Sequence, residues 1–348
     1  MKAVRIHEHG GTEQLRLEEI PEPKPGHGEV LVRLKACALN YRDIQGRLGR
    51  RGPRKLKIPL PHILGGDGAG IVAQLGEGVA ALKPGDAVLL THVVGCGYCS
   101  WCLAGSDQCC PAKGTLGNEL PGTYAQYIKV PRANVIPKPA DLTFGEASSF
   151  ALALITCWPM MITRGRLRAG EEVLVHAAGS GIGSMAIQIA KSFGARVITT
   201  AGVEAKLQRA LDLGADEVIN YRQKKFVEEV LQLTNGRGVD MVVDPVGGQT
   251  FVESIDVLAQ RGRIVTCASG SLAGDNLTFG LSKAREKNAD LIFSSLGSKG
   301  ELLEALELVK QKRIKPVIHQ VLSLDDVADA HRMLEERRQF GKIVLSIP

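Results

Sequence analysis

The sequence lacks a strong excess of charge of either sign. Its 43 Lys and Arg residues stand against 37 Asp and Glu residues, which gives a formal net charge of +6 over 348 residues. Most of the basic residues alternate with acidic ones, so the composition gives no reason to expect a nucleic acid as partner. A mild positive charge of this size is compatible with an anionic cofactor.

The sequence also lacks a segment with the length and apolarity of a membrane span. Its most apolar stretch, 150–162, is interrupted by Thr156 and Pro159 and is shorter than the roughly 20 residues that a spanning helix needs. The first 20 residues carry many charges and no apolar core, which predicts no signal peptide. Eight cysteines without a secretion signal argue against a disulfide framework, so we expect a cytoplasmic protein.

Internal repeats and low-complexity linkers are absent as well, and the length predicts two domains. The first 150 residues are rich in short alternating segments such as 30–35, separated by Pro and Gly, which indicates β-structure. The pattern changes near residue 165. The continuous apolar run at 173–177 is typical of a strand that is buried on both faces of a sheet.

From there to residue 296 the expected strands alternate with segments of helical periodicity. Helices are expected at 182–193, 204–213 and 224–233. The six expected strands are 173–177, 196–200, 217–219, 240–244, 263–267 and 291–294. Such alternation predicts an α/β fold with a parallel sheet that is covered by helices on both faces.

A glycine-rich turn at 178–183 separates the first of these strands from its helix. Glycines there let a dinucleotide pyrophosphate approach the backbone N–H groups and the positive end of the helix. The turn departs from the motif G-x-G-x-x-G at Ala178 and Ser180. The prediction of a dinucleotide site therefore depends on the position of the turn between a strand and a helix. A turn with a purely structural role is the alternative. The expected contacts are Ser180, Gly181, Ile182 and Gly183.

The end of the second strand bears on the choice of dinucleotide. NAD-binding sites place an acidic residue there for the ribose 2′-hydroxyl, but 200–203 has no acid before Glu204, and the bases Lys206 and Arg209 follow. This favours a 2′-phosphate and therefore NADPH, although the two bases could also form a solvated helix face. The expected contacts of this group are Gly202, Lys206, Tyr221 and Arg222.

Five of the eight cysteines fall within 15 residues. Four of them have the spacing C-x2-C-x2-C-x7-C, and nearby glycines let the backbone wrap tightly; these four are Cys96, Cys99, Cys102 and Cys110. Four thiolates in this arrangement predict a closed, structural Zn²⁺ site, with a chance cluster of free thiols as the alternative. Cys109 is the spare thiol. Cys37, Cys157 and Cys267 stand alone in apolar surroundings and are expected to be buried and inert.

Three short sequence motifs resemble those of a known family: 65–70 (GGDGAG), 83–86 (KPGD) and 122–127 (GTYAQY). With the cysteine lobe and the dinucleotide turn, the chain resembles the medium-chain dehydrogenase/reductase family over essentially its whole length. The resemblance implies a GroES-like β-rich catalytic domain at 1–152 and 297–348, with the zinc lobe at 95–111. It implies a Rossmann domain with a doubly wound parallel sheet at 153–296.

The resemblance to the branch of that family with a catalytic zinc fails at the metal ligands. That branch uses a Cys, a His and a second Cys, and the corresponding positions here hold Asn40, Gly66 and Leu152. Asp67 alone cannot replace the three protein ligands that a catalytic zinc needs, and Cys37 on a strand would lie roughly 10 Å away. The segment 39–43 (LNYRD) instead resembles the quinone and enoyl reductase branch, which works without metal.

The resemblance therefore implies an NADPH-dependent reductase of a quinone, an enone or an enoyl thioester. Asn40 could donate to a substrate carbonyl, and Tyr41 could donate a proton or form a wall, but purely structural roles are equally open. The catalytic candidates are Asn40, Tyr41, Asp43, Asp67 and Thr156. Further cofactor contacts implied by the family are Val246, Cys267, Ala268, Ser269, Phe293, Ser294 and Ser295.

Other readings stay open. The chain could be a zinc-containing alcohol dehydrogenase or a non-enzymatic zinc-binding protein. The basic residues Arg47, Arg50, Arg51, Arg54, Lys55 and Lys57 could form an anion-binding rim or a solvated loop. Beyond a small-molecule substrate, we expect a homodimer or homotetramer that pairs along the strand at 291–294, and neither a membrane nor a nucleic acid as partner.

Overall fold

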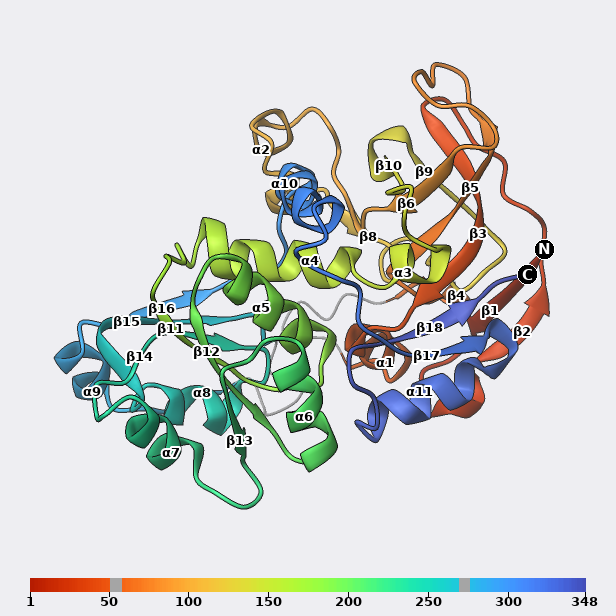
Figure 1. The fold of residues 1–348 in the computed structure, drawn as a ribbon. Helices are drawn as coiled ribbons and strands as arrows, with labels where there is room; N and C mark the ends of the chain where they lie inside the picture. The colour runs from red at the N-terminus through yellow and green to blue at the C-terminus, as the bar shows by residue number, and fades with distance from the viewer. Residues whose placement is uncertain (51–57, 269–275) are drawn as a thin grey trace. The chain divides into compact units, whose positions relative to one another are not determined.

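A computed structural model describes residues 1–50, 58–268 and 276–348, and it divides the chain into two compact units (Figure 1). Unit 1 comprises residues 1–152, 298–300 and 316–348, and unit 2 comprises residues 153–297 and 301–315. The α/β fold class is confirmed, with a β-rich first unit and a second unit built on a parallel sheet. Among the described residues, no helix is both long and apolar enough to cross a membrane.

The expected return to the first unit at residue 297 is too early. Helix α10 (Lys299–Lys310) belongs largely to unit 2, since residues 301–315 cluster there. Its acidic side chains hold it to the end of helix α4 (Ala151–Trp158) and to the segment that follows: Trp158 Nε1 donates to Glu304 Oε2 at 3.3 Å, and Thr163 Oγ1 donates to Glu301 Oε1 at 2.5 Å. The sequence prediction missed this, because helix periodicity does not say which unit a helix packs against.

Unit 1 is organised around a seven-stranded sheet with the order β10-β6-β5-β3-β18-β17, to which β9 is added beside β3. Its central strands are β3 (Glu29–Ala38), β5 (Asp67–Leu75) and β18 (Lys342–Ser346). The other members are β6 (Ala87–Leu90), β9 (Tyr127–Pro131), β10 (Val135–Pro137) and β17 (Ile318–Ser323). Strand β3 contains the alternating segment 30–35 from which β-structure was predicted.

The pairing of these central strands brings distant parts of the sequence together. Ala38, the last residue of β3, lies opposite both Asp67 of β5 and Val344 of β18. Helix α1 (Tyr41–Arg47) begins three residues after Ala38. The start of β5, the start of β18 and the start of α1 are therefore neighbours within unit 1.

The remaining elements of unit 1 are short. A second sheet has the order β2-β1-β4, and a two-stranded ribbon pairs β7 with β8. These strands are β1 (Lys2–Ile6), β2 (Arg16–Glu19), β4 (His62–Ile63), β7 (Val93–Val94) and β8 (Gly114–Thr115). The helices are α2 (Ser100–Leu103), α3 (Phe144–Ser148) and α11 (Val327–Glu335).

Unit 2 contains a six-stranded parallel sheet with the order β13-β12-β11-β14-β15-β16. In chain order this is 3-2-1-4-5-6, the order of doubly wound dinucleotide-binding folds. The strands are β11 (Glu172–Val175), β12 (Arg196–Ala201), β13 (Glu217–Asn220), β14 (Val239–Asp244), β15 (Leu258–Thr266) and β16 (Asp290–Phe293). The strand order reverses between β11 and β14, which is where such sheets bind their ligands.

Helices connect these strands, and the first three lie where the periodicity predicted them. They are α5 (Gly181–Ser192), α6 (Glu204–Asp212), α7 (Phe226–Leu233), α8 (Gly248–Ser254) and α9 (Leu281–Glu286). The apolar strand residues Val173, Leu174, Val242, Val243 and Ile264 are fully buried. A continuous apolar run was the expected mark of strands that are covered on both faces.

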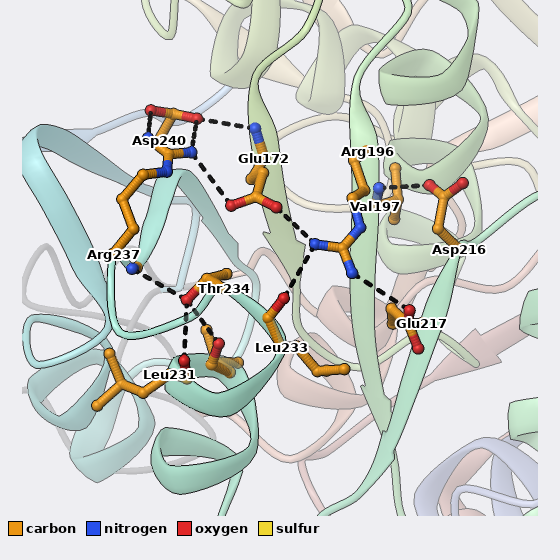
Figure 2. A network of polar contacts seen from close by, with 12 residues as sticks. Glu172, Arg196, Val197, Asp216, Glu217, Leu231, Leu233, Thr234, Arg237 and Asp240 are labelled. Carbon is orange, nitrogen blue, oxygen red and sulfur yellow. Dashed lines mark hydrogen bonds and ion pairs between the residues drawn. The ribbon is translucent and has the colours of Figure 1, made fainter.

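The N-terminal ends of four of these strands are joined by a network of charged side chains (Figure 2). Glu172, which opens β11, accepts hydrogen bonds from Arg196 of β12 at 2.5 Å and from Arg237 at 3.1 Å. Arg196 also donates to Glu217 of β13 at 3.2 Å, and Arg237 donates twice to Asp240 of β14 at 2.8 Å. The network ties these strands together at the edge opposite their C-terminal ends.

Asp240 is a key acceptor of this network, because it also accepts the backbone N–H of Glu172 at 2.8 Å. Burial raises the pKa of Asp240, but hydrogen bonds from Arg237 and Glu172 outweigh it and hold the pKa below its ordinary value of 3.8. A depressed carboxyl pKa stabilises the folded state above the ordinary value, and the stabilisation is lost as the pH falls below it.

We therefore expect Asp240→Asn to lower the free energy of unfolding at pH 7 by about 1 kcal/mol, a figure reduced for the partial exposure of its partner Arg237. The difference from wild type should shrink as the pH falls below 3.8, where the wild-type carboxylate becomes protonated. Denaturant unfolding at several pH values measures this. The matched control is Asp329→Asn, which breaks an exposed Asp–Arg pair with Arg332; a loss as large as that of Asp240→Asn would contradict the argument.

Candidate functional site

The four predicted cysteine ligands come together within unit 1. One ligand atom from each of Cys96, Cys99, Cys102 and Cys110 lies within 4.8 Å of all the others. Within residues 1–50, 58–268 and 276–348 these four form the single group of three or more His, Cys, Asp or Glu residues that could hold a metal ion. The donor set and its closeness fit a tetrahedral Zn²⁺ ion.

Backbone N–H groups donate hydrogen bonds to two of these thiols. The N–H of Cys99 donates to Cys96 Sγ at 3.3 Å, and the N–H of Cys96 donates to Cys110 Sγ at 3.4 Å. Hydrogen bonds of this kind, first of all from the N–H of Tyr98, lower the pKa of Cys96 to about 6. Gly97 has a φ of 85°, the left-handed backbone that glycine adopts without strain, and it turns the chain between the first two ligands.

The other thiols lie outside the cluster. Cys109 is exposed, whereas Cys37 and Cys157 are buried, as expected for inert core thiols. Burial raises the pKa of both Cys37 and Cys157 far above the ordinary value. Burial likewise raises the pKa of the half-buried Cys267 to about 12.

The place where related enzymes hold a catalytic zinc has no ligand set here. A Cβ atom on Gly66 would lie 2.7 Å from Nδ1 of the buried His92 and 3.2 Å from Leu152 Cδ1, so no imidazole fits at this position. Asn40 and Leu152 offer no thiolate, and Asp67 is the one carboxylate. These residues do not fit a catalytic zinc.

A lysine that the sequence prediction missed lies beside Asn40 and Asp67. Lys342, the first residue of β18, donates to Asn40 Oδ1 at 2.5 Å and to Asp67 Oδ2 at 3.0 Å. Asn40 Nδ2 in turn donates to Asp67 Oδ2 at 3.0 Å. The three side chains therefore form a closed ring of hydrogen bonds, which we call the Lys342 ring.

Asp67 makes further bonds outside this ring. Its Oδ1 accepts the backbone N–H of Leu152 at 2.8 Å, and its backbone carbonyl accepts the hydroxyl of Thr123 at 2.7 Å. Asp67 is completely buried. Its oxygens therefore bind other protein groups and not solvent. Amide N–H groups of Asn40 are also engaged, because Nδ2 reaches the carbonyl of Ala38 at 3.4 Å in addition to Asp67.

Asp43, another catalytic candidate, is buried and caps the helix on which it lies. Its Oδ2 accepts the backbone N–H of Asn40 at 2.8 Å and the hydroxyl of Tyr124 at 3.1 Å. Burial raises the pKa of Asp43 to about 6, against the opposing effect of the hydrogen bond from Asn40. Tyr124 Oη also lies 3.3 Å from Nε2 of the buried His331. The half-buried Tyr41 packs against the apolar core of unit 1.

The expected basic rim is wrong for Arg47. This residue is fully buried, forms an ion pair with Glu335 of α11 and donates to the carbonyl of Gly10 at 3.3 Å. A charged side chain can be buried only with such partners, and Glu335 is too far away in sequence to be identified from a pattern. The rim residues Arg51, Arg54, Lys55 and Lys57 lie outside the described part of the chain.

In unit 2 the predicted dinucleotide turn joins β11 to α5. Ser180 is the N-cap of α5, and its hydroxyl accepts the N–H of Gly183 at 2.8 Å. A Cβ on Gly183 would lie 2.2 Å from the carbonyl oxygen of Ala177, so only glycine allows this close approach of strand and helix. The N–H groups of the first turn of α5, at Gly181 and Ile182, are those that a pyrophosphate would use.

The predicted contacts for the ribose side gather around two glycines. A Cβ on Gly202 would lie 2.7 Å from Tyr221 Oη and 3.0 Å from Arg222 Nε. A Cβ on Gly179 would lie 2.8 Å from Cδ of Lys206. The ends of β12 and β13 therefore bring a phenol and a guanidinium to one place, and an ammonium side chain lies over the glycine-rich turn.

The remaining predicted contacts follow the C-terminal ends of β14, β15 and β16. Buried Asp244 shapes the first of them by accepting the N–H groups of Val246 and Gly247 at 2.8 and 2.9 Å. Phe293 is 60% exposed and stacks on Phe251. The residues at the three ends are Val246, Cys267, Ala268, Phe293, Ser294 and Ser295. Thr156 is buried in α4, and Ser269 lies outside the described residues.

Comparison with known proteins agrees with this architecture. Residues 26–140 match the alcohol dehydrogenase GroES-like domain, and residues 181–311 match the zinc-binding dehydrogenase domain. A relative named NAD-dependent alcohol dehydrogenase, from Sulfolobus acidocaldarius, is 35% identical over the whole of both chains. The chain is a medium-chain dehydrogenase/reductase. The GroES-like and Rossmann domains predicted from the sequence are thereby confirmed, and this dehydrogenase/reductase is an oxidoreductase of a family that uses NAD(P).

Two further relatives of this dehydrogenase/reductase differ in their names. A protein from Metallosphaera sedula named acryloyl-coenzyme A reductase is 31% identical over 99% of this chain and 100% of its own. A solved structure titled NAD-dependent alcohol dehydrogenase is 45% identical over the whole of both chains, with a TM-score of 0.95. The family is therefore established, and the choice between reduction of a conjugated acceptor and oxidation of an alcohol is not.

We expect this dehydrogenase/reductase to bind about one Zn²⁺ ion per chain at the cysteine cluster. Cys102→Ser should reduce the zinc content to near zero and lower Tm, because zinc binding contributes to the folding of such a lobe. Cys109→Ser is the matched control, since this exposed thiol lies beside the cluster without belonging to it. Elemental analysis and thermal unfolding measure both effects. Full zinc content in Cys102→Ser would show that the metal is bound elsewhere.

Proposed function

We propose that this chain is an NADPH-dependent reductase of conjugated acceptors, such as quinones, enones or enoyl thioesters, and that it works without a catalytic metal. The observation that carries the proposal is the Lys342 ring. The one carboxylate in the place of the catalytic zinc is bound by an ammonium group and by an amide. A zinc ion there would have to displace Lys342 from Asp67, and within the described residues no group of three His, Cys, Asp or Glu side chains surrounds this position.

The chemistry of the acceptor agrees with such a site. Oxidation of an alcohol needs a group that lowers the pKa of the hydroxyl, which is the usual task of zinc. Reduction of an electron-poor double bond needs a hydrogen-bond donor for the carbonyl oxygen, which gains negative charge during the reaction. Bound NADPH would supply the hydride. The proposed donor in unit 1 is the Asn40 amide, whose long 3.4 Å bond to the carbonyl of Ala38 would give way to the substrate oxygen.

The name of the Metallosphaera sedula relative, acryloyl-coenzyme A reductase, supports this proposal because it denotes reduction of a conjugated thioester. A second candidate is an alcohol dehydrogenase, which is favoured by the names of the Sulfolobus acidocaldarius relative and of the solved structure. That function would need either a metal site from other residues or an acid–base route through protein groups. The proposal as a reductase needs neither.

The preference for NADPH rests on the basic groups near Gly202 and Gly179. Arg222 and Lys206 are cations, and a 2′-phosphate is the part of NADPH that would attract them. No acidic residue follows β12 until Glu204, at the first position of α6. We infer that Tyr221 packs against the adenosine and that Arg222 binds the 2′-phosphate.

We also propose that the protein forms at least a homodimer along the edge strand β16. This strand is at the end of the sheet, and Phe293 at its end is 60% exposed. An edge strand with exposed apolar side chains favours pairing with another strand.

The function is tested with zinc-loaded wild-type protein and a panel of acceptors: a benzoquinone, an α,β-unsaturated ketone, acryloyl-CoA and a saturated aldehyde. We expect oxidation of NADPH with one or more of the conjugated acceptors and little with the aldehyde. The reverse assay uses NADP⁺ and NAD⁺ with primary and secondary alcohols. Robust turnover of an alcohol, together with about two zinc ions per chain, would establish the alternative function instead.

The choice of cofactor is tested with Arg222→Ala. We expect KM for NADPH to rise by about tenfold, since one charge-assisted hydrogen bond to the 2′-phosphate is lost. KM for NADH should stay within about twofold, because NADH lacks that phosphate. Lys225→Ala, which removes a nearby exposed cation paired with Glu228, serves as control. An equal rise of both KM values in Arg222→Ala would refute the assignment.

A further inference from the structure

The Lys342 ring lies at a junction of the first unit. Lys342 opens β18, Asp67 opens β5 and Asn40 is the N-cap of α1. Through the N–H of Leu152, the same carboxylate also holds the first turn of α4. The ion pair and the hydrogen bonds to Asp67 therefore connect the starting points of four elements.

The ring is also thoroughly buried. The side chain of Lys342 is 7% exposed, and that of Asp67 is 1% exposed. An ammonium group in such surroundings is stable only if its hydrogen-bond partners replace water. Two of its three N–H bonds have protein acceptors among the described residues, namely Asn40 Oδ1 and Asp67 Oδ2.

The ring fixes which way the Asn40 amide faces. Lys342 has only N–H donors, so it binds the oxygen of the amide, and the carboxylate of Asp67 has only acceptors, so it binds the nitrogen. Exchange of the amide oxygen and nitrogen would place two donors against each other at Lys342 and two acceptors against each other at Asp67. Both charges therefore impose the same orientation on Asn40.

From this geometry we propose that Lys342 is a positioning residue of the reductase: it holds Asp67 and orients Asn40 in the place where related enzymes have a metal. The proposal rests on the proposed function. It assigns to a single positive charge the ordering that a zinc ion provides elsewhere in the family. It further predicts that the loss of Lys342 lowers turnover even in a variant whose fold has regained its stability.

The two effects can be separated because a buried ion pair differs from either partner alone. Removal of one partner leaves an uncompensated buried charge, which destabilises strongly. Replacement of both by neutral groups removes that penalty, so the fold can recover. The orientation of Asn40 does not recover, because its oxygen has then lost the donor from Lys342.

The experiment compares Lys342→Met, Asp67→Asn and the double variant Lys342→Met/Asp67→Asn in the zinc-loaded protein. Tm is measured for each, along with kcat and KM for NADPH and for the best conjugated acceptor of the wild type. We expect both single variants to lose Tm and the double variant to regain much of it. We expect kcat to fall by about 100-fold in Lys342→Met and to stay low in the double variant.

Two further variants complete the set. Lys342→Arg keeps the positive charge and should retain more of kcat than Lys342→Met does. Lys129→Met is the matched control, since it removes an exposed strand lysine that is paired with Glu29. It should leave both Tm and kcat close to the wild-type values.

The proposal is overturned if kcat returns together with Tm in the double variant, because Lys342 would then serve the fold alone. It is also overturned if Lys342→Met keeps kcat within about twofold of wild type. The wild type is assayed beside the variants, on whichever substrate it turns over. Failure of the wild type with every conjugated acceptor counts against the proposed function, whereas the ratio of variant to wild type judges Lys342, so either idea can fail alone.

Discussion

The pairing of a buried ammonium with a buried carboxylate is the constraint on which the site of this protein depends. Lys342 and Asp67 can be buried only together, and both bind Asn40, the residue that stands where the catalytic-zinc branch of the family has its first cysteine ligand. The same bond aligns β18, β5 and the start of α1. The residues that stand at the family's metal-ligand position and the starting points of these elements are therefore linked by the same hydrogen bonds.

Much of the fold could be predicted from the sequence, because its signals are local. The continuous apolar run before the 178–183 turn and the helical periodicity after it predicted β11 and α5, and the spacing of the four cysteines predicted a cluster that the structure brings together. The assignment of α10 was wrong. Periodicity describes one face of a helix, and it contains no information about the partner of that face.

The candidate site also contains residues that could be predicted from the sequence and residues that could not. Residues on the dinucleotide side follow strand ends, so the family resemblance and the rule that ligands bind at the C-terminal ends of parallel strands could predict them without any long-range contact. Lys342 escaped prediction because its partners lie 275 and 302 residues away in sequence. Arg47 was misplaced for the same reason: its charge suggested a surface, and its burial depends on Glu335, which is 288 residues distant.

The charged network at the N-terminal ends of β11, β12, β13 and β14 gives the Rossmann sheet a division of labour. One edge of the sheet is locked by ion pairs, while the other ends in turns whose shape is set for a ligand. The ion pairs and the turns alternate along the sequence, but they lie at opposite ends of the same strands. Substitutions among the ion pairs would therefore change the stability of the sheet, and substitutions in the turns would change the choice of dinucleotide, with little effect of one on the other.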